Sequence, residues 1–396
     1  MAVTDVRLMK EMEGPALDAA GRAEETERRG RLSEKAVAEL SEAGVFRLLQ
    51  PARYGGGEVD PRSYFEVIRE LSAACGSTGW VASVLGVHAW HLALFPEAAQ
   101  KEVWGRDPEV LTCSSYAPTG KVRVVPGGYR ISGRWSFSSG CDHAEWALLG
   151  GSVVEGGTAV DLCTFLVPSG DYEIDPVWDT VGLRGTGSND LVVEDAFVPD
   201  HRVLSFKDTT LCRVPGQEVN TAPLYRIPFG SLFPYAVAAP VIGMATGVYR
   251  EHVEYSRNRV RAVERDLATA AGKKANEDPT VQLGIAEAAC DIDASWLQLE
   301  RNFSSLMERA RDHALIPVAL RTAIRRDQAA AVRRSVRAAD LLFGNSGGRA
   351  LRSGGRIQRL WRDAHAGSAH AYNDHDRTSR LFGRSELGLN VREPVL

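Results

Sequence analysis

The sequence predicts an α+β fold in which a β domain separates two helical regions. Helical patterns occupy residues 1–110, short strand-like runs occupy residues 111–218, and helical patterns return over residues 219–396. Strands that follow one another without intervening helices favour an antiparallel sheet. Long helical segments in succession are typical of a bundle. We therefore expect an N-terminal helical domain, a middle antiparallel β domain and a C-terminal four-helix bundle.

The N-terminal helices are indicated by capping residues and by the spacing of apolar side chains. Asp60 and Pro61 form a favourable helix start, because Asp can cap and Pro suits the first turn. Ser77 and Thr78 are expected to cap a second helix that runs to Leu92. This second helix has no polar face, which predicts that it is buried.

A hairpin marks the middle region. The segment 126–128 is Pro-Gly-Gly, and it separates the strand-like runs 121–125 and 129–137. Further strands are expected at 146–150, 159–167 and 191–198. In the last region, long helical patterns are expected at 250–270, 280–313 and 317–343, with one more from residue 357.

Composition and charge exclude several classes of protein. The 396 residues carry 47 basic and 51 acidic side chains, so no nucleic-acid partner is expected. The longest apolar run, 236–248, is interrupted by Pro240, Gly243 and Gly247, so no membrane span is expected. Residues 1–20 lack a signal-peptide pattern, and the six cysteines form no CxxC pair. These features predict a cytoplasmic protein with free thiols and no metal site.

The usual phosphate-binding and hydrolase signatures are missing or out of place. No GxGxxG follows a strand and no GxxxxGK[ST] occurs, which disfavours a Rossmann or a P-loop enzyme. Gly344 to Gly348 formally matches the nucleophile elbow GxSxG, but it follows a helical pattern instead of a strand. An α/β-hydrolase is therefore not expected.

Three groups of residues could carry chemistry. The segment 135–143 ends a strand in a glycine turn and places hydroxyls beside aromatic rings, which suits either a polar strand end or a platform for a planar ring. His88 and His91 lie on the apolar helix, where a histidine is commonly a core residue. His365 and His370 are separated by about 140° around a helix, which disfavours a shared metal ion. A histidine of near-neutral pKa suits deprotonation of a phenol or an indole N–H.

The order of elements and several motifs resemble the acyl-CoA dehydrogenase fold. The motifs are 181–186 (VGLRGT) with 197–199 (FVP), 255–259 (YSRNR), 342–348 (LFGNSGG) and the pair Arg362-Asp363. Within that superfamily, the sequence resembles the oxygenase components of two-component flavin-dependent aromatic hydroxylases, including those that act on 4-hydroxyphenylacetate and on a phenolic secosteroid. The segments that carry this closer likeness are 86–91 (GVHAWH), 114–116 (SSY), 135–143 (WSFSSGCDH) and 362–370 (RDAHAGSAH).

The resemblance implies an activity with defined cofactors and partners. A separate NAD(P)H:flavin reductase would supply reduced flavin, either FADH2 or FMNH2. The reduced flavin would react with O2 to give a C4a-hydroperoxide, which would hydroxylate a small electron-rich aromatic substrate of phenol or indole type, expected to be polycyclic and apolar. The resemblance also implies a homotetramer.

The resemblance further implies roles for individual residues. Ser139 would hydrogen-bond the flavin N5, His370 would deprotonate the substrate, and Arg259 would lie by the flavin phosphates of a neighbouring subunit. The expected catalytic residues are His370, Ser139 and His88. The expected substrate-binding residues are Ser114, Trp90 and His91. The expected cofactor-binding residues are Tyr116, Trp135, Ser138, Ser139, Arg259, Asn345 and Gly347.

Three alternatives remain open at this stage. A desaturase of the acyl-CoA dehydrogenase type is disfavoured because His and Asn follow Arg362-Asp363, where those enzymes have E-G-T. An N-hydroxylase of an amino sugar would need a polar pocket, whereas the aromatic and aliphatic side chains near the histidines predict an apolar one. An inactive scaffold protein is disfavoured because Ser139, His88 and His370 are all present.

Overall fold

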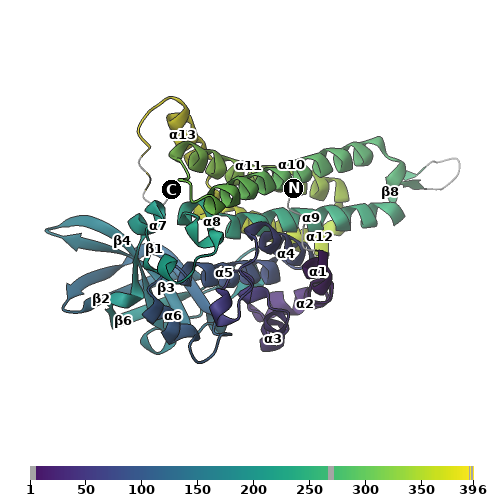
Figure 1. Ribbon diagram of the computed structural model, residues 1–396. Coiled ribbons are helices and arrows are strands. Elements are labelled where there is room, and N and C mark those ends of the chain that lie inside the picture. Colours follow the sequence, from purple (N-terminus) through teal and green to yellow (C-terminus); the bar gives the residue numbers. More distant parts are fainter. Residues whose placement is uncertain (1–5, 266–271, 392, 394–395) are drawn as a thin grey trace.

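The computed structural model describes residues 6–265, 272–391, 393 and 396. Three groups of elements follow one another along the chain: helices, a β-sheet and a second set of helices. Figure 1 shows the sheet at one end of the molecule and the longest helices running alongside the N-terminal ones. Both sets of helices and the sheet contribute to one continuous hydrophobic core.

The N-terminal helices begin largely where the capping residues predict. Asp60 accepts a hydrogen bond from the backbone N–H of Arg62 at the start of α4, as expected. The apolar helix α5 differs, because it begins at Gly76 and Ser77 accepts from the backbone N–H of Gly185 at 3.1 Å instead of capping it. Every residue of α5 is buried, which confirms the prediction. The bounds are α1 (Val6–Glu11), α2 (Glu13–Arg29), α3 (Glu34–Glu42), α4 (Pro61–Ala74), α5 (Gly76–Leu92) and α6 (Glu97–Trp104).

The seven-stranded sheet has the order β5-β6-β2-β1-β3-β4-β7. The expected hairpin joins β1 and β2, with Val125 opposite Gly128. One pair departs from the antiparallel prediction: β1 and β3 are parallel, with Thr112 opposite Trp146. Because β2 returns the chain to the start of β1, β3 begins there on the other edge of β1 and runs in the same direction. The bounds are β1 (Thr112–Val125), β2 (Gly128–Ser138), β3 (Trp146–Glu155), β4 (Thr158–Pro168), β5 (Glu173–Asp175), β6 (Asn189–Pro199) and β7 (Val203–Ser205).

The C-terminal region contains the long helices, and one of them begins and ends earlier in the chain than predicted. The helix expected at 250–270 ends at Asn258, and a β-hairpin formed by β8 and β9 follows it. Val260 and Val263 favour a strand there, and Ala270 lies outside the described residues. The bounds are α7 (Phe206–Leu211), α8 (Phe229–Leu232), α9 (Tyr235–Asn258), β8 (Val260–Arg265), β9 (Gly272–Lys274), α10 (Pro279–Arg311), α11 (Val318–Ser346), α12 (Arg356–Ser368) and α13 (His375–Glu386).

The central helix of the core is α9, which packs against α4, α5, α10, α11 and α12. Within the described residues, the stretch Phe229–Arg257 is long and apolar enough to cross a membrane. However, 94% of its most apolar window is buried inside the protein. The apolar composition of this stretch is therefore explained by its packing.

Candidate active site

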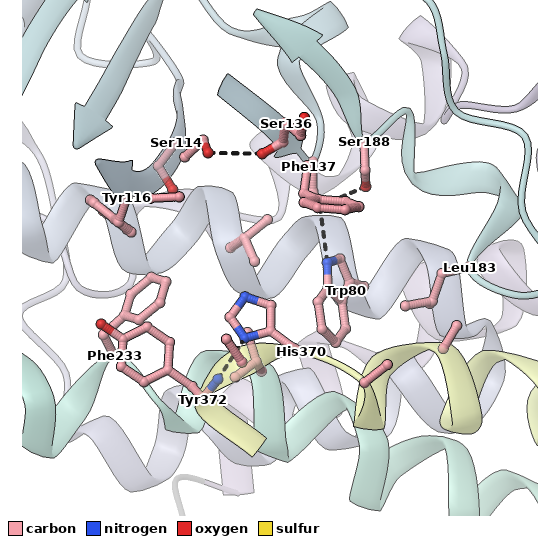
Figure 2. A pocket seen from close by; sticks show the side chains of 18 of the residues that line it. Trp80, Ser114, Tyr116, Ser136, Phe137, Leu183, Ser188, Phe233, His370 and Tyr372 are labelled. Atoms are coloured by element: carbon pink, nitrogen blue, oxygen red, sulfur yellow. Dashed lines mark hydrogen bonds between the residues drawn. The ribbon is translucent and has the colours of Figure 1, made fainter. Parts of the chain in front are cut away.

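A cavity of about 800 Å³ lies where the sheet meets the two helical regions. Side chains from α5, β1, the end of β2, the loop before β6, α9, α11 and the segment after α12 line it. Figure 2 shows serines on the sheet side of this cavity and His370 with Tyr372 on the C-terminal side. Its volume falls within the range of about 300–1,000 Å³ that is typical of small-molecule sites. Most of its lining is apolar or aromatic.

On the sheet side, Ser139 belongs to a chain of hydrogen-bonded hydroxyls. The indole N–H of Trp80 donates to Ser139 Oγ at 3.1 Å, and Ser139 Oγ lies 2.7 Å from Ser188 Oγ. Ser188 Oγ lies 2.6 Å from Thr186 Oγ1, which donates to the backbone carbonyl of Leu183 at 2.9 Å.

This chain has a direction, because each hydroxyl has a single proton to donate. The proton of Thr186 is used on the Leu183 carbonyl, so Ser188 must donate to Thr186 and Ser139 must donate to Ser188. Ser139 therefore keeps one oxygen lone pair for a ligand and has no proton to offer it. Its geometry suits an N–H donor, which is what a reduced flavin presents at N5.

His370 follows α12 and lies on the opposite wall. The backbone N–H of Tyr372 donates to His370 Nδ1 at 3.2 Å, so a neutral imidazole carries its proton on Nε2. Figure 2 shows this other ring nitrogen directed into the cavity. Burial, and secondarily the charge of Arg325, lower the pKa of His370 to about 4. His370 is thus neutral at pH 7 and offers the cavity a hydrogen-bond donor. His365, by contrast, is bonded to Asp340 outside the cavity lining.

His88 and Ser114 form a second polar pair in the cavity. The Thr112 carbonyl lies 2.6 Å from His88 Nδ1 and can only accept, so that nitrogen carries the proton. Nε2 of His88 then accepts from the hydroxyl of Ser114 at 2.8 Å. Burial lowers the pKa of His88 to about 4, which keeps it neutral. The hydroxyl proton of Ser114 is thus donated to His88, and Ser114 Oγ can accept a hydrogen bond from a ligand.

The two other residues predicted on α5 do not reach the cavity. Trp80 and His88 both line it, because residues eight positions apart lie on the same face of a helix. Trp90 is fully buried and donates to the backbone carbonyl of Leu224 at 3.0 Å. His91 is also buried, and its Nδ1 lies 2.8 Å from the hydroxyl of Tyr116, which does line the cavity. The structure thus places His91 behind Tyr116 and Trp90 in the core, and neither residue lines the cavity.

Two of the residues predicted to bind cofactor face away from the cavity. Trp135 packs closely against Gly120 and donates to the Gly150 carbonyl at 2.7 Å. Ser138 is fully buried and does not line the cavity. Side chains alternate along a strand, and Phe137 interrupts the alternation with a φ of 67°. The chain therefore turns after Ser138, which is why Ser139 reaches the cavity and Trp135 does not.

A third predicted group comes together at a different place. The Arg259 guanidinium donates to the backbone carbonyl of Asn345 at 3.1 Å. A Cβ at Gly347 would lie 2.3 Å from an Arg259 nitrogen, and Gly347 has a φ of 68°. None of these three residues lines the cavity. They cluster where β8 begins, at the end of the long helices away from the sheet (Figure 1).

Asp363 positions one wall of the site. Its Oδ1 accepts from the backbone N–H of Leu183 at 2.6 Å, and its Oδ2 would lie 2.5 Å from a Cβ at Gly76. Asp363 thus holds the loop before β6 against the start of α5. Burial, opposed by the Leu183 hydrogen bond, raises the pKa of this carboxyl to about 7.

Several cavity residues were not predicted. Trp80 could have been found from its spacing to His88, and Tyr372 follows His370 closely in sequence. Others carry no signal in the sequence, because their position depends on how distant segments meet. The unpredicted residues include Trp80, Ser188, Phe233, Arg325 and Tyr372.

The fold and the cavity define a flavin-binding enzyme of the acyl-CoA dehydrogenase type. Residues 16–107 match the family model "Acyl-CoA dehydrogenase, N-terminal domain", and residues 235–375 match "Acyl-CoA dehydrogenase, C-terminal domain". The oxygenase subunit HsaA of a flavin-dependent monooxygenase from Rhodococcus jostii is 49% identical over 375 residues, which cover 95% of this chain and 97% of that protein. Its counterpart from Mycobacterium tuberculosis is 50% identical, covering 93% and 92%.

The chain belongs to the oxygenase subunits of flavin-dependent monooxygenases. The crystal structure of 3-HSA hydroxylase from Rhodococcus sp. RHA1 superposes with a TM-score of 0.94 at 47% identity, covering 99% of each chain. XiaF from Streptomyces sp., solved with FADH2, gives a TM-score of 0.88 at 29% identity, covering 98% and 97%. The FADH2-dependent resorcinol hydroxylase of Rhizobium sp. is 37% identical, covering 98% and 95%. The cofactor of this chain is reduced flavin, and an oxygenase subunit implies a reductase partner.

Proposed function

We propose that this oxygenase hydroxylates an apolar, polycyclic phenol of the secosteroid type. The observation that carries the proposal is the Ser114–His88 pair, which lines the same largely apolar cavity as His370. Relatives that are 49% and 50% identical are HsaA oxygenase subunits, and one matching crystal structure is that of a 3-HSA hydroxylase. A cavity of about 800 Å³ has room for a substrate larger than a single ring beside a flavin ring.

The hydrogen-bond directions assign a part to each polar group. The phenolic O–H donates to Ser114, and when the phenol loses its proton, the Ser114 proton passes to His88 Nε2. The negative charge of the phenolate then stabilises the protonated His88, which burial keeps neutral in the empty cavity. The Nε2–H of His370 then donates to the phenolate oxygen and stabilises its charge. His370 thus acts as a donor instead of the base that the resemblance implied, because its Nδ1 is already occupied by the Tyr372 N–H. A phenolate ring is richer in electrons than a phenol ring and is more readily hydroxylated.

The flavin side of the cavity is formed by the hydroxyl chain and Trp80. When bound, reduced flavin supplies the electrons and, with O2, the oxygen atom that enters the substrate. Ser139 would accept the flavin N5–H, since it has a free lone pair. The apolar lining and Trp80 exclude water from that position, which favours transfer to substrate over release of hydrogen peroxide.

The alternatives fit this cavity less well. A desaturase needs a carboxylate base, and among the described lining residues the single carboxylate is Glu393, which is paired with Arg377 at 2.7 Å. An amino-sugar N-hydroxylase would need more hydrogen-bonding groups than this largely apolar lining offers. An indole N–H could also donate to Ser114, and we favour a phenol because the relatives include a resorcinol hydroxylase and a p-hydroxyphenylacetate 3-hydroxylase.

We also propose that the working enzyme is a homotetramer supplied by an NAD(P)H:flavin reductase. The Arg259 cluster lies away from the cavity of its own chain, as expected if it serves the flavin phosphate of a neighbouring subunit. Exposed Leu283 and Leu297 on α10 offer apolar surface for such a contact. Light scattering on the purified protein tests the tetramer, and flavin binding by Arg259→Ala, which we expect to be weaker, tests the role of the Arg259 cluster. A monomer, or an Arg259→Ala variant with full flavin affinity, would contradict the corresponding statement.

The test of the proposed activity uses chemically reduced flavin, O2 and three aromatic compounds. These are a polycyclic phenol, its methyl ether and an indole of similar size. We expect the phenol to gain one oxygen atom by mass spectrometry, and the ether to remain unchanged because it cannot form a phenolate. Equal hydroxylation of the ether, or preference for the indole, would contradict the proposal.

A further inference from the structure

One charged side chain in the cavity has no part in the chemistry described above. Arg325 lies on α11, is 7% exposed and lines the cavity. Its guanidinium donates to the Gln328 side chain at 2.5 Å and to the backbone carbonyl of Tyr372 at 3.0 Å. Among the described residues, no carboxylate lies within ion-pairing distance of it. Both partners are neutral, and the five N–H donors of a guanidinium exceed the two that these contacts use.

Arg325 is connected to the flavin side of the cavity through three aromatic side chains along one wall. Trp80 donates to Ser139, and its ring centroid is 6.1 Å from that of His370. The His370 ring stacks on Tyr372 at 5.8 Å, and the Arg325 guanidinium lies 5.1 Å from the Tyr372 ring centre. Figure 2 shows Trp80, His370 and Tyr372 in this succession.

The two other charged side chains that line the cavity neutralise each other. Arg377 and Glu393 both line the cavity and form an ion pair at 2.7 Å. Arg325 is therefore left as a buried cation held by neutral groups. Burial of an unpaired charge is costly, and such groups are usually compensated by a partner or a ligand. Burial also lowers the pKa of Arg325 to about 10, which leaves it charged at pH 7.

We propose that Arg325 binds a carbonyl oxygen at the end of the substrate remote from its phenolic hydroxyl. The carbonyl is that of a ketone or of a carboxylate, since both offer lone pairs to a guanidinium. The substrate is then held at two points, with its hydroxyl at Ser114 and His370 and its carbonyl at Arg325. This inference rests on the proposed function and adds a required group to the substrate.

The experiment measures binding without turnover. Three phenols carry the same apolar chain, which ends in a methyl ketone, a carboxylate or a hydrocarbon of equal size. Dissociation constants come from quenching of tryptophan fluorescence in the full-length protein. The variants are Arg325→Met and, as a matched control on the same helix, Arg333→Met, whose side chain is exposed. Reduced-flavin affinity and circular dichroism verify that each variant is folded.

We expect wild type to prefer at least one carbonyl compound over the hydrocarbon. Arg325→Met should weaken binding of that compound by about ten- to a hundredfold. It should leave the hydrocarbon unchanged, and Arg333→Met should change none of the three. Equal weakening of all three by Arg325→Met would show that Arg325 only positions Tyr372, and would overturn the proposal. So would a wild type that does not discriminate. Turnover is scored separately, so a lack of hydroxylation would count against the proposed function alone.

Discussion

The indole of Trp80 and the imidazole of His370 lie 6.1 Å apart between their ring centres, on two segments separated by most of the chain. Trp80 also donates to Ser139, so one side chain touches both the flavin side and the substrate side of the cavity. Trp80 therefore links Ser139, on the expected flavin side, to His370 on the opposite wall.

Ser139→Ala should uncouple flavin oxidation from hydroxylation. The variant removes the oxygen that would accept the flavin N5–H and breaks the hydroxyl chain to Ser188. We expect the fraction of reduced flavin that ends as hydrogen peroxide to rise several-fold. The measurement is the ratio of peroxide to hydroxylated product. Ser138→Ala is the matched control, because Ser138 is the neighbouring serine and does not line the cavity. An unchanged ratio for Ser139→Ala would remove its assigned role.

His370→Ala should keep flavin binding and lose hydroxylation. Loss of one preorganised donor to a developing oxyanion typically lowers the rate by about 10²–10³-fold. Single-turnover kinetics with saturating reduced flavin measure this loss. His365→Ala serves as the control, since that histidine is bonded to Asp340 outside the cavity lining. Normal product formation by His370→Ala would show that another group stabilises the phenolate.

The buried histidines should determine how the free energy of unfolding and the activity change below pH 6.5. Burial lowers the pKa of His88 and of His370 from 6.5 to about 4. The unfolded chain therefore binds more protons than the folded one in this interval, and these two groups make the free energy of unfolding fall as pH drops from 6.5 towards 4. Activity should persist at pH 5.5, where free histidine is mostly charged. Urea unfolding at several pH values and initial rates measure the two quantities. An acid limb of activity centred near 6.5 would contradict the assigned burial.

Gly79→Ala should destabilise the protein strongly. A Cβ at Gly79 would lie 1.9 Å from Ser72 Oγ and 2.5 Å from the Ser72 backbone, where α4 and α5 cross. Overpacking of this kind costs about 1–3 kcal/mol, or more where backbone must move. Gly344→Ala is the matched control, because Gly344 also lies in a helix and its Cβ would meet nothing within 4 Å. The measurement is the midpoint temperature of thermal unfolding of each variant. Equal midpoints for the two variants would contradict the close approach of α4 and α5 at Gly79.

Local signals in the sequence predict much of the fold. The Asp60-Pro61 helix start and the turn at 126–128 are properties of a few adjacent residues, and both appear in the structure. The parallel pairing of β1 and β3 is not local, because it depends on which edge of β1 remains free after the hairpin forms. The end of α9 at Asn258 was also missed, since helical spacing continues past the point where the hairpin pairs.

The site could be predicted only in part. Ser139 and His88 were named from motifs, and both line the cavity. The resemblance also assigns Trp135 and Trp90 to the site, yet strand alternation and helix periodicity direct their side chains into the core. Arg325 was missed because nothing in the sequence distinguishes it from the other arginines of α11. Its burial follows from packing against the segment after α12.

Folding changes the proton binding of the Asp363 carboxyl and of the buried histidines in opposite directions. Its pKa rises from 3.8 to about 7, so near pH 5.5 the chain takes up one proton there as it folds. At the same pH, His88, His91, His252 and His370 release protons, because burial lowers the pKa of each. Folding therefore exchanges protons with the solvent in both directions, with a net release. Calorimetric unfolding enthalpies at pH 5.5 should depend on the ionisation enthalpy of the buffer.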